Sequence, residues 1–174
     1  MEYLKISHMD TEILTSMIKK LESVFSKDNL LTIQRGNKLD YLGMDFDFSK
    51  KVRVGIGMEK SIEAMLQDMP EDMNVWTNTP AATCLFDTEE KSEKLTEKEA
   101  QFFHTTTSKM LFMSKRSRPD IQTAVSFLCT RVKDPDCNDY KKPRQVIRYL
   151  QRTINLVMRI QIDDTTVIKW WVDA

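Results

Sequence analysis

Apolar residues between residues 13 and 25 recur every three or four positions, over about four helical turns. This spacing predicts an amphipathic helix with one buried face, and Asp10 is well suited to cap its N-terminus. Short strands are expected before and after the helix, over residues 3–7 and 30–34, and Gly36–Asn37 is typical of a turn.

A regular alternation of apolar and polar residues then predicts a β-hairpin. Residues 39–48 form its first strand, residues 52–58 form its second, and Ser49–Lys51 form the turn between them. One face is apolar, while the other carries charged residues and glycines. The glycines are Gly43, Gly55 and Gly57. Glycine weakens a strand unless something approaches its backbone closely, so we expect a chain or ligand to lie flat on this face. A bulged edge hairpin is the alternative interpretation.

A short helix is expected over residues 62–69 and is ended by Pro70. The polar, acidic stretch that follows, residues 71–94, has no regular period. A connection of this length is either a linker between domains or a functional insertion, and we interpret it as a linker between two modules.

The next part of the chain predicts a bundle of three helices. Residues 96–99 form a capping box, which starts a helix that runs to about residue 115. Pro119 is suited to the first turn of a second helix, whose apolar stripe extends to Val132. A third helix is expected over residues 139–152, and the short joints between the three helices favour a small bundle.

Alternation returns in residues 156–162 and predicts a strand, and a second strand with two tryptophans follows the turn at Asp163–Asp164. A strand pair alone is marginally stable, so this end of the chain is expected to open a further domain. Asp173 comes directly after the tryptophans. A carboxylate at the end of such a strand is typical of a first metal ligand, and its partner acids would lie further along a longer chain.

Charged residues are strongly segregated along the chain, although the net charge is zero. Residues 59–99 contain eleven acids and four lysines, a net charge of −7. Residues 109–152 contain eleven lysines and arginines and four aspartates, a net charge of +7. Basic residues on helices suit sequence-independent contacts with a nucleic-acid backbone, so this segregation indicates a surface that faces a polyanion. The alternative is that the acidic and basic segments pair with each other.

Other features exclude several classes of protein. The three cysteines and two histidines are widely spaced, which disfavours a zinc site or a disulfide framework, and free thiols fit a reducing compartment. The N-terminus lacks an apolar signal-peptide core, and no apolar run is long enough to span a bilayer. We therefore expect an intracellular protein, cytoplasmic or nuclear, with no membrane association. No glycine-rich phosphate loop or nucleophile elbow is present, so no small-molecule ligand is evident.

Two aspartates of the expected hairpin, Asp45 and Asp47, share one strand face. Paired carboxylates of this kind can hold a divalent metal, but an exposed hairpin face more often carries solvated carboxylates.

Several motifs of the chain resemble, in the same order, the copia-type retrotransposon polyprotein. They are YLGMDFDFS at residues 41–49, TPAATCLF at residues 79–86, SKRSRPDIQTAVSFLCTRV at residues 114–132 and WWVDA at residues 170–174. The resemblance begins at LKISH, residues 4–8, and covers nearly the whole chain. The matching part of the polyprotein is the later half of its reverse transcriptase and the first strand of its ribonuclease H.

The resemblance implies an α+β fold taken from a right-handed polymerase. Residues 1–58 would be the end of the palm, with a primer-grip-like β-hairpin, and residues 59–95 would be a short helix and an acidic linker. Residues 96–153 would be a helical thumb and connection bundle. Residues 154–174, with a terminal strand pair, would be the start of a truncated ribonuclease H-like domain.

The resemblance also implies a partner, an RNA or DNA primer–template, and Mg²⁺ as the cofactor of the intact RNA-directed DNA polymerase. Further partners would be the missing fingers, palm and ribonuclease H regions of the same polyprotein. Asp173 matches the first ribonuclease H acid. The residues expected to contact the nucleic acid are Tyr41, Gly43, Lys115, Arg116, Arg118, Arg144 and Arg148.

One departure from the family concerns catalysis. The family carries a Tyr-Val-Asp-Asp turn just before the strand that corresponds to residues 4–8, whereas this chain has Met1, Glu2 and Tyr3 there. Two-metal phosphoryl transfer needs several converging carboxylates, so we expect no polymerase or nuclease activity from this chain alone. The alternative function is a small helical interaction protein whose charges are structural and which binds no nucleic acid.

Overall fold

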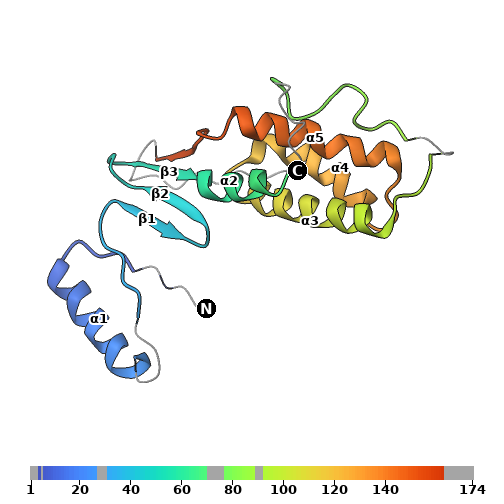
Figure 1. Ribbon diagram of the computed structural model, residues 1–174. Helices are drawn as coiled ribbons and strands as arrows, with labels where there is room; N and C mark the ends of the chain where they lie inside the picture. Colours follow the sequence, from blue (N-terminus) through green and yellow to red (C-terminus); the bar gives the residue numbers. More distant parts are fainter. Residues whose placement is uncertain (1–3, 5, 27–30, 70–76, 89–91, 163–174) are drawn as a thin grey trace, which may run out of the picture.

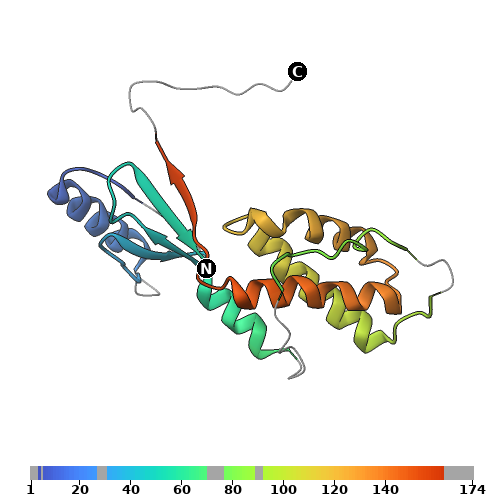
Figure 2. The ribbon, with the colours of Figure 1, turned by 90° about the horizontal axis from the view of Figure 1, so that it is seen from above.

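Figure 1 shows the computed structural model of the chain, which describes residues 4, 6–26, 31–69, 77–88 and 92–162. These residues form five α-helices, one short 3-10 helix and a four-stranded antiparallel sheet, which confirms the α+β class. The sheet lies between a helical bundle and the separate N-terminal helix (Figures 1 and 2). None of the helices in the described ranges is both long enough and apolar enough to cross a bilayer.

The sheet is an antiparallel meander with the strand order β1-β2-β3-β4. Its strands are β1 (Lys38–Tyr41), β2 (Met44–Asp47), β3 (Arg53–Gly57) and β4 (Met158–Gln161). The expected hairpin is present as β2 and β3, with Phe46 opposite Ile56. The expected single strand over residues 39–48 is wrong, because the chain turns back within it and forms both β1 and β2.

The turn between β1 and β2 consists of Leu42 and Gly43. Both residues have positive φ angles, 54° and 72°. Two consecutive positive φ angles characterise the mirror-image turn that matches the right-handed twist of two antiparallel strands. Leucine rarely adopts this conformation, which explains why the residue types did not predict the turn.

Strand β4 completes this same sheet, since Met158 and Ile160 pair with Ile56 and Val54 of β3. The prediction that it opens a separate domain is therefore wrong for residues 158–161. The second strand expected after Asp163–Asp164 lies outside the described residues.

One face of the sheet is apolar and the other carries charges and glycines, as the alternation predicted. The segment that leads into β4 lies on the glycines. A Cβ atom added to Gly55 would stand 3.1 Å from Cγ1 of Val157, closer than ordinary contact allows. The chain that approaches this face is therefore the protein's own segment, and the strand pairing of β2, β3 and β4 runs without a bulge.

Helix α1 (Thr11–Phe25) forms where the periodicity predicts it, and the Asp10 side chain accepts a hydrogen bond from the Glu12 amide, 2.8 Å away. The expected buried face is wrong, because no residue of α1 is buried. The strands expected on either side are also absent at their described positions, residues 4, 6–7 and 31–34. A local pattern can start a helix, but burial and strand formation need a neighbouring surface.

The bundle contains α2 (Glu59–Gln67), α3 (Glu97–Ser114), η1 (Pro119–Ile121), α4 (Gln122–Arg131) and α5 (Cys137–Arg152). The predicted capping box at Thr96 is confirmed, with both of its hydrogen bonds present. Pro119 starts the η1–α4 helix as expected, although its first turn is 3-10. A second capping box, formed by Asp136 and Asp139, starts α5 two residues earlier than predicted.

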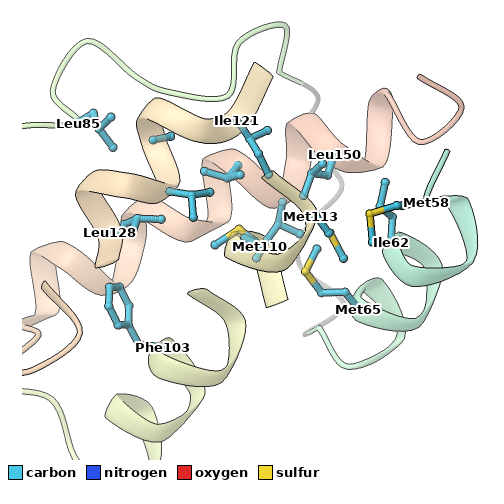
Figure 3. Packing of buried hydrophobic residues seen from close by; sticks show 14 residues of the cluster. Met58, Ile62, Met65, Leu85, Phe103, Met110, Met113, Ile121, Leu128 and Leu150 are labelled. Carbon is cyan, nitrogen blue, oxygen red and sulfur yellow. The ribbon is translucent and has the colours of Figure 1, made fainter. Parts of the chain in front are cut away.

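Fourteen buried apolar residues form one core in the described part of the bundle (Figure 3). The core includes Ile62 and Met65 of α2 and Leu85 of the segment between α2 and α3. That segment is further attached through Gln145, whose amide donates to the Thr79 carbonyl at 3.0 Å. The described residues 59–69 and 77–88 of the region expected to be a short helix and an acidic linker, residues 59–95, thus contribute to the same core as the three-helix bundle.

Candidate nucleic-acid interface

The predicted contact residue Arg118 lies inside the protein, with a side-chain exposure of 0%. Its Nε and Nη2 atoms donate to the Asp120 carboxylate at 2.8–3.3 Å. Its other donors reach the Thr153 carbonyl at 3.1 Å and the Thr153 hydroxyl at 2.6 Å. A guanidinium that is buried and fully engaged in this way has no surface from which to contact a phosphate. The prediction for Arg118 is therefore corrected, and its role is to join the start of α4 to the end of α5.

The environment of Asp120 fits this structural role. Burial favours a raised pKa, but hydrogen bonding from Arg118, together with the Tyr149 hydroxyl, outweighs burial and lowers the pKa of Asp120 below its ordinary value. The carboxylate is therefore held in its charged form beside the guanidinium.

Lys115 and Arg116 lie on the surface at the C-terminal end of α3. The Arg116 guanidinium stacks over the Phe112 ring, 3.8 Å from its centroid. An arginine stacked in this way is partly ordered before any ligand arrives, which lowers the entropic cost of contacting a phosphate.

The remaining predicted bases, Arg144 and Arg148, belong to a stripe along α5. Lys141, Arg144, Arg148 and Arg152 follow one another at intervals of three or four residues, so they start from one side of the helix. The buried residues Val146, Ile147 and Leu150 lie on the opposite side. Lys141 and Arg152 are exposed and the two between them are half-buried. At 1.5 Å per residue, the stripe spans roughly 16 Å.

Ion pairs between the acidic and basic segments were the alternative to a surface that faces a polyanion. Among the described residues, Lys109 and Asp68, with 2.6 Å between Nζ and Oδ2, form the one ion pair in which a base of residues 109–152 meets an acid of residues 59–99. The buried bases pair instead with aspartates of their own segment, as Arg118 does with Asp120. Lys115, Arg116, Arg148 and Arg152 make no ion pair with any residue that the structure describes.

The sheet presents its two predicted contact residues next to the bundle. Gly43 lies at the tip of the β1–β2 turn, and Tyr41 is the last residue of β1. The Ser61 hydroxyl of α2 donates to the Gly43 carbonyl at 3.0 Å. The turn is therefore attached to the first part of α2.

A groove between α2 and α3 extends from this attachment, and the sequence did not reveal it. Its volume is about 680 Å³. It is lined by Ser61, Ala64, Met65, Gln67, Asp68, Ser108, Lys109, Phe112 and Met113. The i, i+4 spacing of Phe112 and Arg116 was the signal that could have drawn attention to this side of α3.

A wider hollow lies over the glycine-bearing face of the sheet, with a volume of about 940 Å³. Acidic and basic residues line it in equal numbers, so it has no net charge with which to attract a polyanion.

The paired aspartates Asp45 and Asp47 have partners other than a metal within the described residues. Asp45 and Asp47 share a strand face, but Lys60 lies 3.5 Å from the Asp45 carboxylate, and the Asp47 carboxylate accepts the Ser49 amide. No three acids, histidines or cysteines of the described ranges converge on a point that could hold a metal ion. Glu2, Tyr3 and Asp173 lie outside these ranges.

Comparison of the chain with protein families, with curated proteins and with solved structures found no match.

Proposed function

We propose that this chain is the later part of a copia-type reverse transcriptase, from the end of the palm through the thumb. In this proposal β2 and β3 correspond to the primer grip, α2 to α5 correspond to the thumb and connection, and the module binds the phosphate backbone of a primer–template duplex. The support from sequence is the ordered set of motifs described above.

The observation that carries the proposal is the division of the basic residues into two groups. The buried bases Arg118 and Lys142 have aspartate partners, as a folded protein requires. The exposed Lys115 and the half-buried Arg116 and Arg148 make no ion pair with the described residues, and the proposal assigns their charges to phosphates.

The proposed activity is binding without catalysis. The sequence contains no Tyr-Val-Asp-Asp turn, and the described carboxylates do not converge. A primer-extension assay with the purified chain is expected to give no template-dependent synthesis above background, and synthesis would contradict this part of the proposal.

Binding is tested by fluorescence anisotropy with a labelled RNA–DNA hybrid duplex over a range of KCl concentrations. The logarithm of the binding constant should fall linearly with the logarithm of the salt concentration, by about 0.9 for each phosphate contact. Replacing Lys115, Arg116 and Arg148 with glutamine should therefore flatten the slope by about three, since three contacts are removed.

The matched control replaces three lysines elsewhere, Lys19 and Lys20 of α1 and Lys98 of α3, with glutamine. The net charge changes equally in both variants, so only the position of the charges differs. Equal slopes in the two variants would mean that the bases act through net charge alone, and absence of salt-dependent binding in the natural chain would favour a small helical interaction protein instead.

A further inference from the structure

The groove between α2 and α3 has the dimensions and lining of a ligand site. At about 680 Å³ it lies in the range of small-molecule pockets, and its floor contains the methionines Met65 and Met113. Small side chains, including Ala64 and Ser108, keep it open. It therefore offers a shallow apolar slot large enough for one flat aromatic group.

Phe112 is the feature that indicates which ligand would enter. It lies in the last turn of α3, 39% of its surface is exposed, and it lines the groove. The Arg116 guanidinium lies over the same ring. Aromatic rings and arginine planes are the surfaces on which proteins stack unpaired nucleic-acid bases.

Charges at the rim of the groove fit the phosphate that accompanies a base. Lys109 lines the groove and Arg116 borders it through Phe112. Asp68 is the acidic residue of the lining, and its carboxylate holds the Lys109 ammonium across the groove, from α2 to α3. Both side chains are partly exposed, so a phosphate could compete for Lys109.

We propose that this groove binds an unpaired base at a single-stranded end of the nucleic acid, with Phe112 as the stacking surface and Lys109 and Arg116 as phosphate contacts. A paired base within a duplex cannot present its face to a side chain, which is why the ligand must be unpaired. The inference rests on the proposed function, because it names the part of the nucleic acid that one section of the interface recognises.

The experiment compares three fluorescent DNA ligands that share one duplex: a blunt duplex, the same duplex with a four-nucleotide overhang, and the same overhang built from abasic nucleotides. The natural chain should bind the base-bearing overhang about fivefold more tightly than the other two, as expected for one stacked base. Phe112→Leu should remove this preference. Because the ring also orders Arg116, the readout is the ratio of overhang to blunt-duplex affinity within each variant.

Two further variants distinguish the loss of base stacking from a general loss of protein stability. Ala64→Leu should fill the groove and remove the same preference without altering Phe112. Phe86→Leu is the matched control, since Phe86 is another exposed aromatic residue in ring contact, 5.3 Å from Phe127, and lies outside the groove. Thermal unfolding monitored by circular dichroism should give similar midpoints for Phe112→Leu and Phe86→Leu.

The Asp68→Asn variant tests the contact between Lys109 and a phosphate. The expected result is tighter binding, and a misfolded variant would bind more weakly instead. Removing a carboxylate beside the bound phosphate should tighten binding of the base-bearing overhang about threefold at low salt. An unchanged or weaker affinity would overturn the assignment of Lys109.

The two proposals fail in different ways. If no ligand binds with a dependence on salt, the proposed function is wrong and the inference falls with it. If all three ligands bind equally, or Phe112→Leu keeps the preference for the base-bearing overhang, the groove is not a base site while backbone binding stands.

Discussion

The helical bundle and the N-terminal region show how differently similar sequence patterns can be used. In the bundle, apolar stripes from α2, α3, α4 and α5 converge on one core, in which Phe103, Leu128 and Leu150 have no exposed surface (Figure 3). In the N-terminal region, α1 has an equally regular stripe and the sheet has a clear apolar face. Among the described residues before Met58, however, Ile56 alone is buried.

The difference shows that periodicity determines which element forms but not how much of it is buried. A stripe removes apolar surface from water only where another stripe meets it, and burial supplies most of the stability of a helix in a protein. We therefore expect the bundle to carry most of the folding free energy and α1 to carry little.

The largest expected loss of stability follows substitution of Leu128, in the centre of the bundle. Leu128→Ala should lower the free energy of unfolding by about 2–5 kcal/mol, because it leaves a cavity in a closed core. Leu21→Ala in α1 is the matched substitution at a half-buried position and should cost less than about 1 kcal/mol. Urea unfolding followed by circular dichroism measures both, and equal losses would contradict the comparison.

The second largest expected loss of stability follows substitution of Arg118, which is buried in the bundle. Arg118→Ala should destabilise the protein by about 1.5–3 kcal/mol, because it removes the charged hydrogen bonds to the partly exposed Asp120 carboxylate and to Thr153. Arg116→Ala at the surface removes a guanidinium from the same loop but should cost only about 0.5–1 kcal/mol, the value of an exposed cation–π contact. Thermal unfolding distinguishes the two.

The free energy of unfolding measured as a function of pH, at acid pH, tests the same ion pair between Arg118 and Asp120. The folded pKa of Asp120 is lowered, so its contribution to stability is present above the unfolded pKa of about 3.9 and is lost as the pH falls through the folded pKa. Arg118→Ala should make the loss of stability in this acid range less steep. An unchanged slope would show that Asp120 does not depend on Arg118.

The smallest expected change in stability, a gain, follows a substitution in the N-terminal region, at the β1–β2 turn. Leu42 is held at a φ of 54°, a conformation that asparagine adopts at lower cost than leucine. Leu42→Asn should raise the free energy of unfolding by about 0.5–1 kcal/mol. Leu39→Asn, on the paired and half-buried part of β1, is the control and should lower it. A loss of stability at both positions would contradict the strain assigned to the turn.

The candidate interface was predictable only in part. Charge segregation indicated bases at Lys115, Arg116 and along α5, and on α5 the buried apolar residues do lie on the opposite side of the helix. It failed for Arg118, since nothing in the local sequence distinguishes a surface arginine from one that will be enclosed by Asp120 and by Thr153, 35 residues away. The groove at Phe112 also depends on α2, which lies far from α3 in the chain.

Local chemistry within the chain was sufficient for the helix starts at Asp10 and Thr96, the bundle helices and the β2–β3 hairpin. These features depend on residues only a few positions apart. The interactions that stabilise them therefore form within the segment itself, wherever that segment lies in the fold. The tertiary structure alone decided that β4 joins β3, that Val157 covers Gly55, and that Arg118 is buried while Arg116 is not. Each of these outcomes is a contact between distant segments, and such a contact forms only once the chain has brought two complementary surfaces together.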